Sequence, residues 1–164
     1  MKPCTSTPFR FAANAVRAFV AGIFLLGSHS ANATTYYWDV DGAGSAATGG
    51  SGTWDTSSSL WRNGSSTETL STWPNTDPNT DIAQLAGTGG TITLNSSLVN
   101  INVNKIVFGT TGYTIAGPVS GTATLNLSGT TPTIDTGANA ATINAVIPNA
   151  REKDIRFDSL SMHD

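Results

Sequence analysis

The sequence has little charge, one cysteine and two histidines. Charged residues make up 12% of its 164 residues. Cys4 and His29 both precede Thr34, where we expect the mature chain to begin, so residues 34–164 keep only His163. Neither a disulfide framework nor a thiolate metal site can form there, and one imidazole near the end of the chain supports no Ser/His/Asp triad and no histidine-based metal site. We predict no catalytic residues and no enzymatic activity.

Positive charge is also scarce. Residues 34–164 contain eleven acidic residues but only five basic ones, which are Arg62, Lys105, Arg151, Lys153 and Arg156. A surface with this balance does not attract the phosphates of nucleic acid or an anionic membrane. We therefore expect neither as a partner.

The only long hydrophobic run lies near the start of the chain. It reads AFVAGIFLLG, residues 18–27, and it is followed by Ala31 and Ala33 at the small-residue positions of a cleavage site. Three basic residues precede it: Lys2, Arg10 and Arg17. This order is typical of a secretory signal peptide, and the run is shorter than the ~20 residues that span a bilayer. We predict a signal peptide over residues 1–33, export to the cell surface, the outer membrane or the medium, and no membrane span in the mature chain.

Residues 34–150 consist mainly of Thr, Ser, Gly, Asn and Ala, and no window shows apolar residues at helical spacing. Period-two alternation does occur, most clearly in VNINVN, residues 99–104. Such alternation predicts a strand with one buried and one solvated face. The apolar positions change phase at Lys105, because Ile106 and Phe108 are even-numbered. This shift predicts a bulge or a corner between two strands.

Further short apolar runs recur between Thr91 and Ala150, separated by turns rich in glycine. This rhythm is typical of an all-β sandwich, a barrel or a β-solenoid. Low charge, short strands and many Asn and Thr residues suit a solenoid, in which outward Asn and Thr can form ladders. We favour a right-handed parallel β-helix over residues 91–150, with a β-sandwich as the alternative.

The stretch GTATLNLSGTTPTI, residues 121–134, resembles the autotransporter-associated β-strand repeat. That repeat has a glycine-rich turn followed by T-L-x-L-S-G, matched here by Gly121, Thr124, Leu125, Leu127, Ser128 and Gly129. The Trp-Asp and Gly/Ser-rich segment after residue 33 also looks like the opening of such passengers. The resemblance implies a secreted or surface-displayed β-helix with a structural or adhesive role, of which this chain is an N-terminal fragment.

The segment GTWDTSSSLWRNG, residues 52–64, contains two of the four tryptophans. All four precede the short strands that begin near Thr91. The first coil of a solenoid exposes its interior unless something covers it, and terminal coils are atypical for that reason. We therefore predict that residues 34–90 form a Trp-rich N-terminal cap.

A carbohydrate-active module is the alternative. Flat indoles with a polar edge suit stacking on sugars, and the candidates are Trp54, Trp61 and Trp73. Carboxylates that could act on a glycosidic bond lie near them, at Asp39, Asp41 and Asp55. The partner would then be an extracellular polysaccharide, whereas an adhesive passenger would contact a cell surface.

Two acidic stretches resemble fragments of calcium loops. The stretch DVDGAG carries Asp39 and Asp41, and NTDPNTD carries Asp77 and Asp81. Both lack a full set of oxygen ligands, and Asp in turns usually binds its own backbone. We predict no cofactor, with Ca²⁺ at these aspartates as the alternative.

The composition changes at the end of the chain. Arg151–Asp164 has seven charged residues in fourteen, after a long segment with few. A β-helix that stopped before this tail would leave an open, aggregation-prone end. We expect a truncated product whose tail, residues 151–164, is poorly ordered.

Overall fold

The computed structural model describes residues 32–95, 100–148 and 156–157. The chain divides into two compact units, Met1–Ser30 and Ala31–Asp164, and all the described residues belong to the second. The predicted signal peptide lies almost wholly outside the described residues. A membrane-crossing helix is absent from the described part of the chain.

Every regular element among the described residues is a β-strand, so the predicted all-β class is confirmed. The strands, in chain order, are β1 (Thr35–Trp38), β2 (Gly52–Trp54), β3 (Trp61–Asn63), β4 (Leu70–Ser71), β5 (Ile82–Leu85), β6 (Thr91–Leu94), β7 (Ile101–Val103), β8 (Lys105–Phe108), β9 (Tyr113–Ala116), β10 (Leu125–Leu127), β11 (Thr133–Asp135), β12 (Ala141–Ile143) and β13 (Arg156–Phe157).

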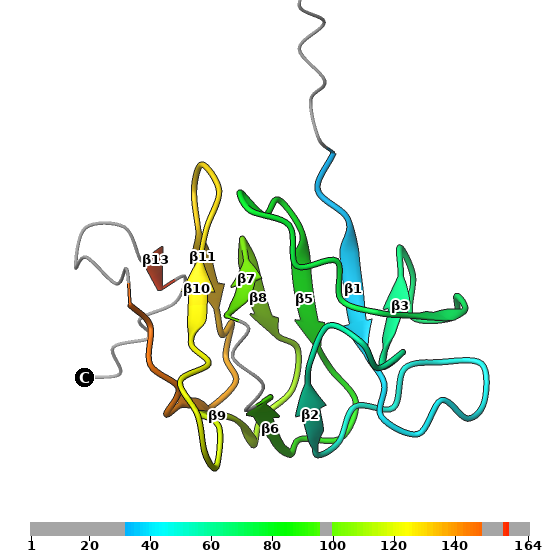
Figure 1. The fold of residues 1–164 in the computed structure, drawn as a ribbon. Coiled ribbons are helices and arrows are strands. Elements are labelled where there is room, and N and C mark those ends of the chain that lie inside the picture. The colour runs from blue at the N-terminus through cyan, green and yellow to red at the C-terminus, as the bar shows by residue number, and fades with distance from the viewer. Residues whose placement is uncertain (1–31, 96–99, 149–155, 158–164) are drawn as a thin grey trace, which may run out of the picture. The chain divides into compact units, whose positions relative to one another are not determined.

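Three sheets contain these strands (Figure 1). The long sheet has the order β13-β11-β8-β5-β1-β3-β4, the four-stranded sheet the order β12-β9-β6-β2, and the two-stranded sheet the order β10-β7. Strands β5, β6 and β7 lie in the long, four-stranded and two-stranded sheets, and β8, β9 and β10 return to the same sheets in the same order. The chain thus makes successive rounds through three sheets, which together we call the stack.

Pairing within the stack is parallel, with antiparallel pairing only where β3 joins β1 and β4 joins β3. The registers align one inward column of the long sheet, formed by Tyr36, Ala83, Ile106 and Ile134. Members of this column are at most 9% exposed. Because side chains alternate along a strand, in-register pairing places buried residues on buried residues from one round to the next.

The corner predicted at the phase shift is confirmed. Strand β7 ends at Val103 in the two-stranded sheet, and β8 begins at Lys105 in the long sheet. Asn104 lies between them, and its side-chain amide donates to the Ser128 carbonyl at 2.9 Å. At this single residue the chain passes from one sheet to the next, and the buried positions change from odd-numbered to even-numbered.

Asparagines on β7 and β10 are linked across rounds. The Asn126 side-chain amide donates to Asn102 Oδ1 at 2.7 Å, and these residues are directly opposite in the register. Asn102 also donates its backbone N–H to Asn75 Oδ1 at 2.7 Å. The non-core positions of these strands therefore add polar bonds along the stack.

Parallel pairing begins before Thr91 and continues into the charged tail. Strands β1 and β5 already pair in parallel, so part of the predicted cap region, residues 34–90, belongs to the same sheets as the later strands. In the tail, Arg156–Phe157 form β13, which pairs with β11. The other residues of the tail, on which the expectation of poor order also depends, lie outside the described residues.

Replacing Ile106 with alanine tests the inward column. Ile106 is 0% exposed and lies between Ala83 and Ile134. Ile106→Ala should lower the free energy of unfolding by about 2–5 kcal/mol in urea denaturation, because its neighbours cannot fill the cavity. Val119→Ala is the control and should change it by less than about 0.5 kcal/mol, since Val119 is 96% exposed. Equal changes in the free energy of unfolding for the two variants would contradict the burial of Ile106 in the inward column.

Candidate functional site

The four tryptophans form one buried cluster. Trp38 ends β1, Trp54 ends β2, Trp61 begins β3 and Trp73 follows β4. Each is at most 1% exposed. Trp61 is central, because its ring centroid lies 4.9 Å from Trp38, 4.8 Å from Trp54 and 4.9 Å from Trp73. The two tryptophans of residues 52–64 thus pack against each other in the interior, with their ring planes tilted by 54°.

The polar edges of these indoles differ in their partners. Trp38 Nε1 donates to the Gly50 carbonyl at 2.9 Å, and Trp73 Nε1 donates to the Asn102 carbonyl at 2.9 Å. Trp54 Nε1 is buried and has no acceptor among the described residues. Bonds to backbone carbonyls fix two of the rings, as buried indoles commonly require.

This burial bears directly on the alternative that these tryptophans stack on sugars. Stacking requires an exposed ring face, but Trp54 and Trp61 are 0% exposed and Trp73 is 1% exposed. Their rings pack against one another in tilted and edge-on contacts instead of meeting solvent. In this fold the three candidates offer no ring face to a carbohydrate.

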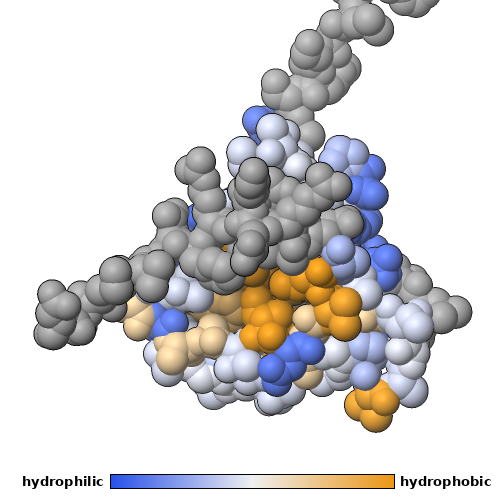
Figure 2. All heavy atoms as spheres, turned by 90° about the vertical axis from the view of Figure 1, so that its left-hand side faces the viewer, coloured by the Kyte–Doolittle hydropathy of each residue, from blue (hydrophilic) through white to orange (hydrophobic). Residues whose placement is uncertain are grey.

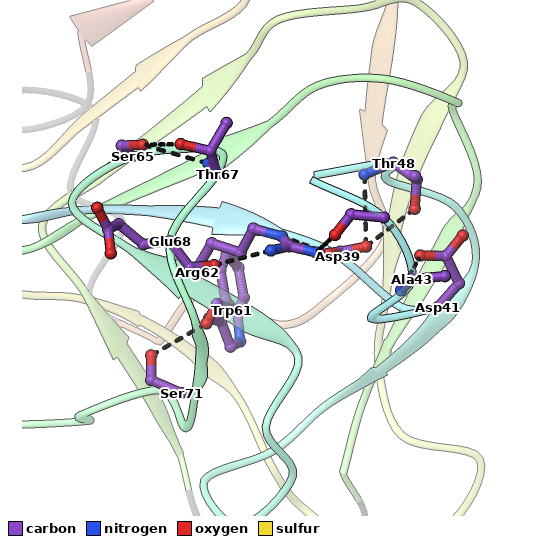
Figure 3. A network of polar contacts seen from close by, with 11 residues as sticks. Asp39, Asp41, Ala43, Thr48, Trp61, Arg62, Ser65, Thr67, Glu68 and Ser71 are labelled. Atoms are coloured by element: carbon purple, nitrogen blue, oxygen red, sulfur yellow. Dashed lines mark hydrogen bonds and ion pairs between the residues drawn. The ribbon is translucent and has the colours of Figure 1, made fainter. Parts of the chain in front are cut away.

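A buried ion pair lies beside the tryptophans (Figure 3). Arg62 Nε donates to Asp39 Oδ2 at 2.6 Å, and the two side chains are 6% and 0% exposed. The other Asp39 oxygen accepts the Thr48 hydroxyl at 2.9 Å, and Arg62 Nη1 donates to the Glu68 carbonyl at 2.8 Å. Both charges are therefore paired and hydrogen-bonded, as burial of charge requires.

The local chain path explains the pair. Asp39 directly follows β1, and Arg62 lies on β3 opposite Tyr37. The loop after Asp39 returns to it at Thr48, next to Gly49, whose φ is +74°. A Cβ at Gly49 would collide with the carbonyl oxygens of Ala86 and Thr88, so the return depends on glycine.

Burial by itself raises the pKa of Asp39, but hydrogen bonds from Thr48 and Arg62 outweigh it and hold the pKa below its ordinary value of 3.8. Asp55 is similar: burial raises its pKa, and bonds from Ser58 and Ser57 lower it further than burial raises it. A general acid for glycoside cleavage needs a raised pKa. The pKa values of these two carboxyls are shifted in the opposite direction.

The calcium candidates are not gathered in one place. Asp39 follows β1 and Asp81 precedes β5, and because these strands are parallel the two carboxylates lie at opposite ends of them. Asp41 accepts the Ala43 N–H at 3.0 Å, and Asp81 accepts the Thr34 N–H at 3.1 Å. Asp77 precedes a cis peptide bond to Pro78. Nowhere do the described residues bring together three or more His, Cys, Asp or Glu side chains.

Sequence reasoning missed the partner of Asp39. Arg62 was visible as one of two basic residues between positions 34 and 150, beside a tryptophan on a short strand. The other basic residue, Lys105, forms an ion pair with Asp135 at 3.0 Å, and both side chains are partly exposed. The sequence signal that could have indicated a buried ion pair was a single arginine, Arg62, in a β-rich segment with few charged residues.

Comparison with known proteins relates the chain to an autotransporter. Over 127 residues it is 38% identical to the adhesin BmaC autotransporter of Brucella suis biovar 1. The matched stretch covers 76% of this chain but only 3% of that protein. No family model and no solved structure matches the chain. The predicted resemblance to autotransporter passengers is thus supported, although the repeat family itself is matched by no family model.

Removing the Asp39 charge should destabilise the fold strongly. Asp39→Asn leaves the buried Arg62 without its counter-charge, which typically costs about 3–5 kcal/mol. The native carboxylate contributes stability above its ordinary pKa of 3.8, and this contribution disappears as pH falls through its lower folded pKa. Urea denaturation should show the full difference between wild type and variant at pH 7 and a smaller one below pH 3.8.

Asp135→Asn is the matched control. It removes the carboxylate of the partly exposed pair with Lys105, so its cost should stay below about 1 kcal/mol. A cost for Asp39→Asn no greater than that of Asp135→Asn at neutral pH would contradict the role of the buried pair.

Calcium should not stabilise the protein. The carboxylates of Asp39, Asp41 and Asp81 accept bonds from the protein itself, and the two acidic stretches are separated. Without an assembled oxygen cage, Ca²⁺ gains no preference for the folded state. Melting temperatures in millimolar Ca²⁺ and in chelator should coincide. A clear rise with Ca²⁺ that Asp77→Asn or Asp81→Asn abolished would contradict this expectation.

Proposed function

We propose that this chain is a segment of an exported passenger, displayed on the cell surface or secreted, with a structural or adhesive role. The observation that carries the proposal is the 38% identity to an autotransporter adhesin over 76% of the chain. Because that match spans 3% of the adhesin, the role is assigned to this segment by its similarity and by its own fold.

The passenger is built as a right-handed parallel β-helix. Two features support a helix over a sandwich: successive strands visit three sheets in rotation, and they pair in parallel with their counterparts one round later. Sandwiches are built mainly from antiparallel strands. The right hand follows from the strong preference for right-handed connections between parallel strands of one sheet.

The tryptophan cluster is the N-terminal cap of this helix. Strands β3 and β4 extend the long sheet beyond β1 with antiparallel pairing, and Trp61 enters the interior from β3. An antiparallel hairpin at this edge ends the parallel series. Four indoles fill the interior at this edge, where the parallel series of the described strands ends.

The four-stranded sheet offers an outer face for adhesion. Its strands contain no charged residue, and Thr91, Thr114 and Thr142 align in register on the face opposite the core. Thr91 and Thr142 are exposed and Thr114 is half-buried. A flat, uncharged row of hydroxyl groups can contact an extended partner through hydrogen bonds without charge steering.

An adhesion assay tests this role. Beads that carry the purified chain should be retained on cultured epithelial cells above beads that carry albumin, and soluble chain should compete. Thr114→Glu places a charge in the threonine row and should reduce retention. Thr133→Glu places the same charge on the long sheet and should leave retention unchanged, with circular dichroism verifying both folds.

Retention equal to that of albumin beads would contradict the adhesive role. Equal retention of the wild type and both variants would contradict the assignment of contact to the four-stranded sheet.

A further inference from the structure

The stack has an apolar hollow at its C-terminal end. A space of about 290 Å³ is lined by Phe108, Ile134, Thr136, Ala141, Ile143 and Ile147. Figure 2 looks onto this end of the fold and shows hydrophobic surface gathered there. A concave apolar surface of this kind is a candidate docking site.

The hollow is the interior of the last round. Ile143 follows Ile115 in the register of the four-stranded sheet, and Ile115 is 0% exposed whereas Ile143 is half-buried. On the side of the two-stranded sheet, Leu125 of β10 donates its N–H to the Val146 carbonyl at 2.9 Å. This bond places Ile147 next to Leu125. The lining therefore belongs mainly to the round that contains β11 and β12, and beyond this round the described residues supply only β13.

Strand β13 lies on this end in the register of the earlier rounds. It pairs in parallel with β11, with Arg156 opposite Thr133 and Phe157 opposite Ile134. The sequence separation from Thr133 to Arg156 equals that from Ile82 to Lys105. Phe157 thus occupies the next register position of the inward column that contains Ile106 and Ile134.

The sequence around β13 has the pattern that a covering strand needs. In DIRFD, residues 154–158, Ile155 and Phe157 alternate with charged residues at positions 154, 156 and 158. Period-two alternation gives a strand one apolar and one charged face. Strand β13 is an edge of the long sheet among the described residues, and charged residues on an edge strand oppose the addition of another strand.

We propose that the C-terminal segment at β13 docks on the hollow and closes the stack, with Phe157 as its apolar anchor. The occupant is this chain itself, because β13 is already paired to the edge of the hollow in the register of a further round. Strand β13 is then the counterpart, at this end of the described strands, of the tryptophan cluster at the other end. This proposal does not depend on the adhesive role.

The test compares two substitutions in β13 of the full chain. Phe157→Ser removes the anchor, and Arg156→Ser changes the neighbouring position on the opposite strand face. Phe157→Ser should raise the fluorescence of the apolar dye ANS several-fold and cause concentration-dependent self-association in light scattering. Arg156→Ser and the conservative Phe157→Leu should resemble the wild type in both measurements.

Hydrogen exchange distinguishes local opening from unfolding. In Phe157→Ser, amides of β11 should lose protection while those of β5 and β8 keep it, so that a folded stack with an open end is observed. The proposal is overturned if Phe157→Ser matches Arg156→Ser in dye binding and β11 protection. It is also overturned if the wild type is a dimer whose dissociation exposes the dye site, since a second copy would then be the occupant.

Discussion

In-register parallel pairing between successive rounds is the constraint on which the rest of the structure depends. A shift of one residue would exchange the buried and outward faces of a strand, so each strand must meet the previous round at one position. Tyr36, Ala83, Ile106 and Ile134 satisfy this rule along the long sheet. Their side chains differ in volume, and what the column preserves is an apolar group at each position.

Stacking leaves the two ends with a problem that the middle does not have. A central strand such as β8 or β9 has a parallel neighbour on each side, whereas β2 and β12 are edges of the four-stranded sheet and have a neighbour on one side only. At the N-terminal end the chain uses large aromatic side chains and an antiparallel hairpin. The Asp39–Arg62 pair lies in the same region and links the end of β1 to β3. A buried ion pair adds little net stability over apolar side chains, but removal of one partner leaves an uncompensated buried charge.

Much of the fold was readable from the sequence, and the failures have physical causes. The alternation in residues 99–104 and the phase shift at Lys105 located β7, the corner and β8, because side-chain parity is a local property of a strand. The partner of Asp39 could not be found in this way, since Arg62 reaches it only through antiparallel pairing of β3 with β1. Composition alone also suggested that the charged tail stands apart from the fold, whereas Arg156–Phe157 pair with β11. Composition shows where the chain becomes more polar, but it carries no information on which strand a residue pairs with.

The division between inward and outward positions bears on how far similarity to the adhesin can be used. Inward columns and glycine-dependent turns restrict which residues are tolerated, while the side chains at outward positions such as Thr91 and Thr114 lie on the face opposite the core. Identity of 38% over 127 residues can therefore preserve the stacking pattern while the outer faces diverge. Two proteins with the same stack can then present different outer faces, because stacking fixes the inward side chains and leaves the outward ones free to vary.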